Sequence, residues 1–234
     1  MKTPVLPRYA RNFQSISLEE QERLASARVC VVGLGGLGGG VVEMLARIGV
    51  GSLDLVDGDC FDETNLNRQL FSSEKDLGVP KAHVARKRVG AINSTVNVNV
   101  FNTFLNRRNA QEIMGHAQVV VDCLDSISHR FLLQELAQTR NIPLVSGAIA
   151  GTAGQVTVIY PGDPGFKLIY GDPYDNKSSG IEEQLGNLAH CALLVASLQS
   201  SEVIKVLLGR GEVLQNRLLV CDLMTNSFEV MQLV

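Results

Sequence analysis

Runs of apolar residues alternate along the chain with segments in which apolar positions recur at helical spacing. The short runs predict buried strands at residues 28–32, 52–56, 119–123 and 144–145. The helical spacing predicts helices at residues 16–27, 38–48, 81–91, 127–139 and 188–208. Strands that alternate with helices form parallel β-α-β units. We therefore predict an α/β fold with a Rossmann-like, doubly wound and mostly parallel sheet.

Other segments carry the alternating pattern of half-buried strands. Residues 97–101 and 155–160 show it, and residues 217–234 predict two antiparallel C-terminal strands around a turn at 224–227. Residues 161–187 contain three prolines and five glycines without clear periodicity, which is typical of a functional loop. We predict one domain over residues 1–234, with a crossover or lid loop at 161–187.

The most informative local pattern is the run Gly33-Leu34-Gly35-Gly36-Leu37-Gly38, between a predicted strand and a predicted helix. Glycines let the backbone approach a phosphate, and the helix N-terminus adds free N–H groups and the positive end of a dipole. A tight turn without a ligand is the alternative, but the flanking elements favour a nucleotide. We expect it to lie against Gly33, Gly35, Gly36 and Gly38.

Asp57 ends the next predicted strand, where an acidic residue binds a ribose hydroxyl in NAD enzymes and in other adenosine-binding proteins. The glycine run and Asp57 alone leave an NAD-dependent oxidoreductase open. The following residues favour an ATP enzyme, because cations can bind phosphate oxygens and stabilise charge on a leaving pyrophosphate. These residues are Asp59, Asn65, Arg68 and Gln69, and then Lys81 at a predicted helix start.

A further carboxylate follows the predicted strand at 119–123. Asp125, with Ser126 beside it, stands at the carboxyl end of this strand, which suits a Mg²⁺ ligand opposite a triphosphate. Taken singly, Arg68, Lys81 and Asp125 could be a surface cation, a helix-face charge and a helix cap. Their order along one chain makes chance a poor explanation.

Together these motifs resemble the ThiF/MoeB/HesA adenylyltransferases, relatives of the ubiquitin-activating enzymes. The resemblance covers nearly the whole chain and is most specific in residues 65–69 and their spacing from the glycine run. It also includes Arg8-Tyr9-x-Arg11, Gly78-x-Pro80-Lys81, Asp122-Cys123-x-Asp125 and residues 143–147, 154–157 and 197–205.

The resemblance implies a reaction, in which AMP from ATP, with Mg²⁺, is attached to the C-terminal Gly-Gly carboxylate of a ubiquitin-like sulfur-carrier protein of the ThiS or MoaD type. Pyrophosphate is released. A carboxylate is already a nucleophile, so the site must only neutralise charge and align the attack. The implied roles are phosphate contact for Gly36, ribose binding for Asp57, triphosphate contact for Asn65, Arg68 and Lys81, Mg²⁺ ligation for Asp125, and phosphate contact by Arg11 from the partner subunit of a homodimer; Asp59, Gln69 and Ser126 complete the nucleotide site.

The sequence departs from this family in its cysteines. Many members hold a structural zinc on two C-x-x-C pairs, and this chain has neither pair, so we expect no zinc ligands. The five cysteines are single and mostly lie in apolar runs, so we expect none to be essential. Sulfur would then come from another protein, and the 161–187 loop would clamp the carrier tail with Tyr170 and Tyr174. We expect His116, His129 and His190 to be surface or capping residues.

Composition adds exclusions. The net charge is −3 and no cluster of Lys and Arg indicates a nucleic-acid partner. No segment reaches the ~18 consecutive apolar residues of a membrane span, and we expect a cytoplasmic protein. Three alternatives stay open: an NAD-dependent oxidoreductase, a non-catalytic nucleotide-binding scaffold, and adenylation of a small-molecule or tRNA-linked carboxylate.

Overall fold

Five parallel strands form the centre of the sheet, in the order β3-β2-β1-β4-β5. The strands are β1 (Arg28–Val32), β2 (Ser52–Val56), β3 (Asn97–Phe101), β4 (Val119–Asp122) and β5 (Leu144–Ala150). The inner residues of β1, β2 and β4 are buried because helices cover both faces, as the continuous apolar runs predict. The structure is a computed structural model that describes residues 6–172 and 185–234.

Three antiparallel strands extend this sheet on one side. β6 (Ala153–Ile159) folds back on β5 across a tight turn at Gly151, which has the positive φ of 60° that favours glycine. β7 (Arg217–Asp222) and β8 (Ser227–Gln232) follow as a hairpin at the sheet edge. The predicted fold class, including the antiparallel C-terminal strands, is therefore confirmed.

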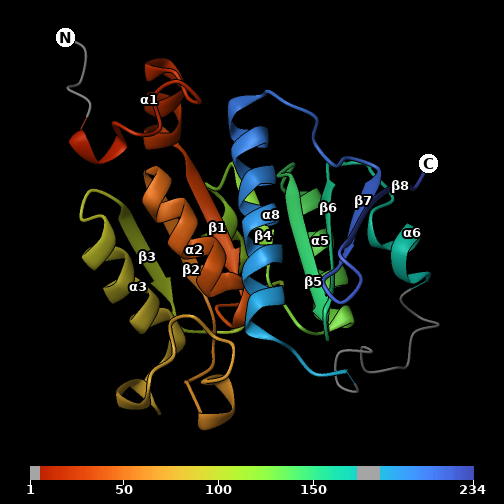
Figure 1. Cartoon of the computed structure of the whole chain (residues 1–234), viewed down its shortest axis with the longest axis horizontal. Helices are drawn as coiled ribbons and strands as arrows, with labels where there is room; N and C mark the ends of the chain where they lie inside the picture. The colour runs from red at the N-terminus through yellow and green to blue at the C-terminus, as the bar shows by residue number, and fades with distance from the viewer. Residues whose placement is uncertain (1–5, 173–184) are drawn as a thin grey trace.

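Four helices cover one face and pack their apolar sides into a shared core (Figure 1). They are α1 (Leu18–Ser26), α2 (Gly36–Ile48), α3 (Lys81–Ile92) and α8 (Ala189–Leu208). On the other face, α4 (Ala110–Met114), α5 (Ile127–Thr139) and α6 (Phe166–Tyr170) enclose a second core. Short 3-10 turns at Pro7–Tyr9, Glu63–Asn65 and Glu74–Asp76 lie in the connections.

Helix α8 is long and apolar enough to cross a membrane by length and composition alone. Half of its apolar window is buried inside the fold, where the helix packs against α2, β5 and β6. The approach to α2 is close, because a Cβ on Gly40 would lie 2.7 Å from the Ala196 side chain. These contacts are those of a core helix.

Three local predictions were wrong or incomplete. The helix α4 is too short to show a periodic pattern, and β5 and β6 are longer than their apolar runs because their ends pair across the Gly151 turn. The predicted loop at 161–187 contains the helix α6, which Gln134 holds by accepting a 2.8 Å hydrogen bond from the Phe166 N–H. The middle of that loop, including Tyr174, lies outside the described residues.

The order of strands reverses direction between β1 and β4, since the chain winds outward on either side of that pair. In doubly wound sheets, ligands bind outside the carboxyl ends of the strands at this switch point. The turns that follow β1 and β4 therefore mark where the site should lie.

Candidate active site

A cavity of about 460 Å³ opens at the carboxyl ends of β1, β2, β4 and β5. Its walls include both turns at the switch point and residues from α5, α6 and the segment before α8. Nine of the predicted site residues line it: Gly33, Gly35, Gly36, Asp57, Asp59, Arg68, Gln69, Lys81 and Asp125. Four do not, and they are Gly38, Asn65, Ser126 and Arg11.

The turn after β1 is shaped by its glycines. Gly33 has a φ of +88°, and a Cβ there would lie only 2.6 Å from the Cys123 carbonyl oxygen. Gly36 opens α2 and faces the cavity, where a Cβ would lie 3.5 Å or more from its neighbours. The first turn of a 13-residue helix thus presents bare backbone N–H groups to the cavity, as an anion site requires.

Gly38 has a different task from the one predicted for it. It points away from the cavity, and a Cβ at this position would lie 1.9 Å from the Gly33 carbonyl oxygen. Its missing side chain lets the start of α2 pack against the end of β1. This is the packing role of the third glycine in a dinucleotide-type turn.

Asp57 is buried at the end of β2 and joins the two loops beside the glycine turn. Its carboxylate accepts hydrogen bonds from the Leu34 N–H at 2.7 Å and the Asp59 N–H at 2.8 Å. Burial raises the pKa of Asp57 above its usual range, and these two hydrogen bonds offset only part of that shift. The cavity-facing carboxylate still has lone pairs that can accept ribose hydroxyl groups.

Arg68 and Gln69 reach the cavity from the turn that follows Asn65. The Arg68 guanidinium donates to the Thr64 carbonyl oxygen at 3.0 Å, which holds the side chain along the turn. Gln69 is only 7 % exposed, and its Oε1 has no hydrogen-bond partner in the described part of the chain. A buried amide atom without a partner at a cavity wall indicates that a polar ligand or water belongs there.

Asn65 supports this turn from behind the cavity wall. Its amide exchanges hydrogen bonds with Asp62, and its carbonyl oxygen accepts the Arg68 and Gln69 N–H groups at 3.1 and 2.9 Å. In this structure Asn65 therefore positions Arg68 and Gln69, and its predicted contact with the triphosphate stays a prediction.

Lys81 begins α3 and points into the cavity although it is 8 % exposed. Its ammonium lies 3.4 Å from the Asp59 carboxylate. The backbone N–H of Lys81 also donates to the backbone carbonyl oxygen of Asp59 at 2.9 Å. The buried Lys81 ammonium therefore shares the cavity with the glycine turn, where a bound phosphate would accept further hydrogen bonds from it.

Asp125 is exposed to the cavity in the turn after β4, facing the glycine turn. Ser126 caps the start of α5 and its hydroxyl pairs with the Ser128 hydroxyl at 2.9 Å, away from the cavity. His129 is exposed, as expected, but it also lies on the cavity wall. The role of a cavity residue was not predicted for it.

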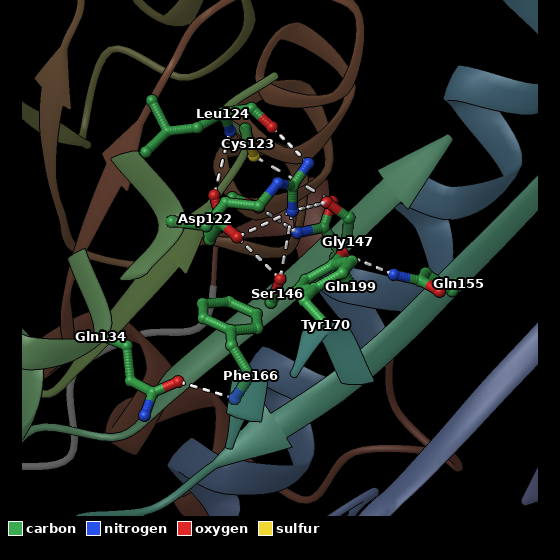
Figure 2. A network of polar contacts seen from close by, with 11 residues as sticks. Asp122, Cys123, Leu124, Gln134, Ser146, Gly147, Gln155, Phe166, Tyr170 and Gln199 are labelled. Carbon is green, nitrogen blue, oxygen red and sulfur yellow. Dashed lines mark hydrogen bonds and ion pairs between the residues drawn. The ribbon is translucent and has the colours of Figure 1, made fainter. Parts of the chain in front are cut away.

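A buried network behind Asp125 was missed by sequence reasoning (Figure 2). Arg130 of α5 donates to the Asp122 carboxylate at 2.9 Å and to the Gly147 carbonyl oxygen at 2.7 Å. The Ser146 hydroxyl donates to the same carboxylate at 2.7 Å. Asp122 and Ser146 lie in motifs that the sequence analysis noted, but their contact with Arg130 joins β4, α5 and β5 and was not predicted.

Another wall of the cavity is formed by α6. Tyr170 of α6 lies there, and its hydroxyl accepts a 2.6 Å hydrogen bond from the Gln155 side chain of β6 (Figure 2). Near Asp57, the Phe104 ring forms part of the rim, 64 % exposed, packed over Gly58. The sequence predicts a role for Tyr170 in clamping the carrier tail, but it gives no signal for Phe104, which follows a strand without any recognisable pattern.

Arg11 lies far from the cavity of its own chain. Its neighbour Tyr9 packs its ring against Gly49, and Gly49 follows the C-terminal end of α2. The glycine turn is at the opposite end of this 13-residue helix, about 20 Å away at 1.5 Å per residue. The exposed Arg11 side chain does not line the cavity of its own chain, and its predicted contact with phosphates in a partner subunit stays a prediction.

The cysteines have no metal partners within residues 6–172 and 185–234, where no group of three or more His, Cys, Asp or Glu side chains could hold a metal ion. The absence of zinc remains a prediction. Burial raises the pKa of the Cys191 thiol to about 11 and also raises the pKa of Cys30, Cys123 and Cys221, so these thiols stay protonated. Cys60 alone of the five is exposed.

The cavity fits a nucleoside triphosphate with its cation. The glycine cradle is open where a Cβ would stand, Gln69 offers an unpaired buried amide, and Lys81 and Arg68 face the same space. The exposed carboxylate of Asp125 suits Mg²⁺, which is usually bound by one or two carboxylates together with substrate phosphates. The chemistry that the walls support is charge neutralisation at a polyphosphate.

Known proteins resemble this chain in sequence and in fold. The ThiF family matches residues 9–234. The chain belongs to the ThiF family. It is 36% identical over 226 residues to a SAMP-activating enzyme E1 of Haloferax volcanii, covering 96% of this chain and 84% of that protein. It is also 36% identical over 231 residues to a sulfur carrier protein adenylyltransferase of Thermus thermophilus, with 95% and 85% covered.

A probable molybdopterin-synthase adenylyltransferase of Porphyra purpurea is 33% identical over 231 residues, and the alignment covers 97% of this chain and 60% of that protein. Among solved structures, PaaA superposes with a TM-score of 0.82 at 22% identity, covering 100% of this chain and 76% of the other. Escherichia coli MccB with ATP gives a TM-score of 0.77 at 23% identity, with 98% and 72% covered. These structures establish the shared fold.

Proposed function

We propose that this ThiF-family protein is an adenylyltransferase that activates the C-terminal carboxylate of a ubiquitin-like sulfur-carrier protein, using ATP and releasing pyrophosphate. The observation that carries the proposal is the meeting of Lys81, Arg68 and Asp125 around a glycine-lined helix N-terminus in one cavity. The relatives named for this activity support it. They give no support to an oxidoreductase.

The chain's own residues account for binding and alignment. Bound ATP and Mg²⁺ supply an electrophilic α-phosphorus and a neutralised triphosphate. The N–H groups at the start of α2 bind phosphate oxygens, while Lys81 and Arg68 stabilise the negative charge that grows on pyrophosphate as its bond to the α-phosphorus breaks. Asp57 accepts the ribose hydroxyls. Asp125 would hold the Mg²⁺ ion, which would neutralise charge on the triphosphate.

No general base is needed in this reaction. A carboxylate oxygen of the carrier forms the new bond to the α-phosphorus, and no proton moves. The tail must reach the cavity in an extended form, and the open side next to Tyr170 and the β5–β6 turn is where we place it. A separate sulfur-donor protein would act after adenylation, since Cys123 on the cavity wall and Cys191 against the Ala153 carbonyl oxygen are both buried thiols whose pKa is raised by burial.

We also propose a homodimer with shared sites, because Arg11 is exposed and its neighbour Tyr9 packs at the end of α2 that lies about 20 Å from the glycine turn. The commonest soluble oligomer is a two-fold dimer, in which each chain can complete the other's site. Heterodimers of an Arg11→Ala chain and an Arg68→Ala chain should recover part of the activity, because one of the two sites is then intact. No recovery in purified heterodimers would contradict shared sites.

The proposed function is tested by ATP–pyrophosphate exchange against a panel of carriers that end in Gly-Gly. We expect exchange that requires Mg²⁺ and one carrier of the panel, and that stops when the carrier's last two residues are removed. Exchange with no carrier, or only with a free small acid or a tRNA, would contradict a protein substrate.

A further inference from the structure

Leu124, the residue before Asp125, is held at its N–H and at its carbonyl group by buried side chains. The Leu124 N–H donates to one oxygen of the Asp122 carboxylate at 3.0 Å. The Leu124 carbonyl oxygen accepts from the Arg130 guanidinium. Because this carbonyl belongs to the same peptide plane as the Asp125 N–H, Arg130 sets the direction in which Asp125 leaves the turn.

Arg130 is built into three elements at once. Its guanidinium donates to Asp122 at the end of β4 and to the Gly147 carbonyl oxygen of β5, while its own Cα lies in α5 (Figure 2). From the other face, the Gln199 side chain of α8 donates to the Asp122 carbonyl oxygen at 2.8 Å. The turn after β4 is therefore fixed from both sides of the sheet.

This fixed turn also contacts the glycine turn directly. The Cys123 carbonyl oxygen lies where a Gly33 side chain would stand, so the two turns touch backbone to backbone. Any shift of the Cys123–Leu124 backbone must change the distance between Asp125 and the glycine turn.

The burial of the pair makes its arrangement specific. Asp122 is fully buried and Arg130 is 4 % exposed, so neither charge can relax into water if its partner moves. Arginine presents a rigid planar fork, which can reach a carboxylate and a carbonyl at fixed angles. A lysine at this position could keep the charge but not the second contact.

We propose that Arg130 is a positioning residue for adenylation, which acts by aiming Asp125 at the cation through the Leu124 carbonyl group. This inference rests on the proposed function, since Asp125 is taken as the ligand of Mg²⁺. It assigns the buried Asp122–Arg130–Ser146 network to the reaction rather than to folding alone.

The test compares Arg130→Lys with the wild type. We expect kcat for pyrophosphate exchange to fall about 10²-fold, since a misplacement of ~1 Å can have this effect, while KM for ATP changes less than about threefold. The Mg²⁺ concentration for half-maximal rate should rise. In the protein without ATP, hydrogen–deuterium exchange should become faster in residues 123–126 and stay unchanged in the β1 and β2 strands.

Arg107→Lys is the matched control, because Arg107 also pairs bidentately with a carboxylate, Glu135 of α5, but at the exposed surface. It should leave both readouts unchanged. If Arg130→Lys does not fold, Ser146→Ala removes one donor to Asp122 and keeps the ion pair. It should give a local increase in hydrogen exchange in the same residues and a loss of activity of about fivefold, which corresponds to the ~1 kcal/mol of one hydrogen bond.

Two results would overturn the inference. One is a folded Arg130→Lys protein with wild-type kcat. The other is a loss of activity without faster exchange at residues 123–126, in Arg130→Lys or, where that variant does not fold, in Ser146→Ala. A wild-type protein that catalyses no pyrophosphate exchange would instead contradict the proposed function, and the hydrogen-exchange comparison would still be measurable.

Discussion

The two turns that meet at the switch point are held in opposite ways. The turn after β1 takes its shape from absent side chains: Gly33 has positive φ, and Gly38 leaves room for the Gly33 carbonyl oxygen. The turn after β4 takes its shape from large buried side chains, with Arg130, Asp122 and Gln199 gripping its backbone.

The difference follows from what each turn must present. The glycine turn presents backbone N–H groups, and any side chain would stand between them and a phosphate. The turn after β4 presents one carboxylate, whose position must be fixed by its surroundings because a carboxylate at a turn is otherwise free to rotate. The glycine turn is therefore shaped by the absence of side chains, whereas the turn after β4 is fixed by a buried polar network.

Asp125→Ala tests the second turn with the largest expected effect. Removing the carboxylate that this network supports should lower kcat for Mg²⁺-dependent exchange about 10²- to 10³-fold, the usual cost of one electrostatic contact to a developing charge. The fold should persist, because Asp125 is exposed. Glu19→Ala on α1 is the control, and a wild-type rate in folded Asp125→Ala protein would remove Asp125 from the metal site.

Gly38→Ala and Gly36→Ala divide the first turn into folding and binding. A Cβ on Gly38 would meet the Gly33 carbonyl oxygen at 1.9 Å, so we expect a loss of about 3 kcal/mol or more in the free energy of unfolding. A Cβ on Gly36 meets no atom closer than 3.5 Å, so this variant should fold normally and raise KM for ATP. Urea unfolding and exchange kinetics measure the two effects. Equal loss of stability in both would show that the turn is not divided in this way.

Phe104→Ala tests whether the Phe104 ring, at the rim of the cavity, binds the adenine base of ATP. An exposed aromatic ring over Gly58, next to Asp57, is placed to stack on adenine. Stacking contributes about 1–3 kcal/mol per base, so KM for ATP should rise between about fivefold and 150-fold with kcat little changed. Phe228→Ala, an exposed aromatic on β8, is the control for ATP binding. An unchanged KM for ATP would show that other walls of the cavity bind the adenine base.

The smallest expected effect concerns the thiols. Burial keeps four of the five cysteines protonated, whereas Cys60 is exposed, so a thiol reagent should modify one cysteine per folded chain. Cys60→Ser should abolish this labelling and keep pyrophosphate exchange within about twofold. Metal analysis of the same protein should find less than stoichiometric zinc. Loss of exchange in folded Cys60→Ser would give this thiol a role in the reaction.

The contrast between the turns also explains how far sequence reasoning could reach. Gly33, Asp57, Lys81 and Asp125 line one cavity, because glycine runs and strand-end charges are local signals that the sheet topology brings together. The sequence did not reveal that Gly38 and Asn65 face away from the cavity, since orientation depends on packing. Arg130 and Ser146 join Asp122 only through tertiary structure, and nothing in their spacing indicates that contact.

The central claim is that this chain joins AMP to a carrier carboxylate. The most direct measurement is the mass of a Gly-Gly-ended carrier after incubation with the protein, ATP and Mg²⁺, beside the same carrier made with a C-terminal amide. The account predicts a mass increase of one AMP on the free-acid carrier, sensitive to Asp125→Ala, and none on the amide. An equal mass increase on both carriers would contradict the account. The absence of an increase on either carrier, together with oxidation of NADH by the protein, would also contradict it.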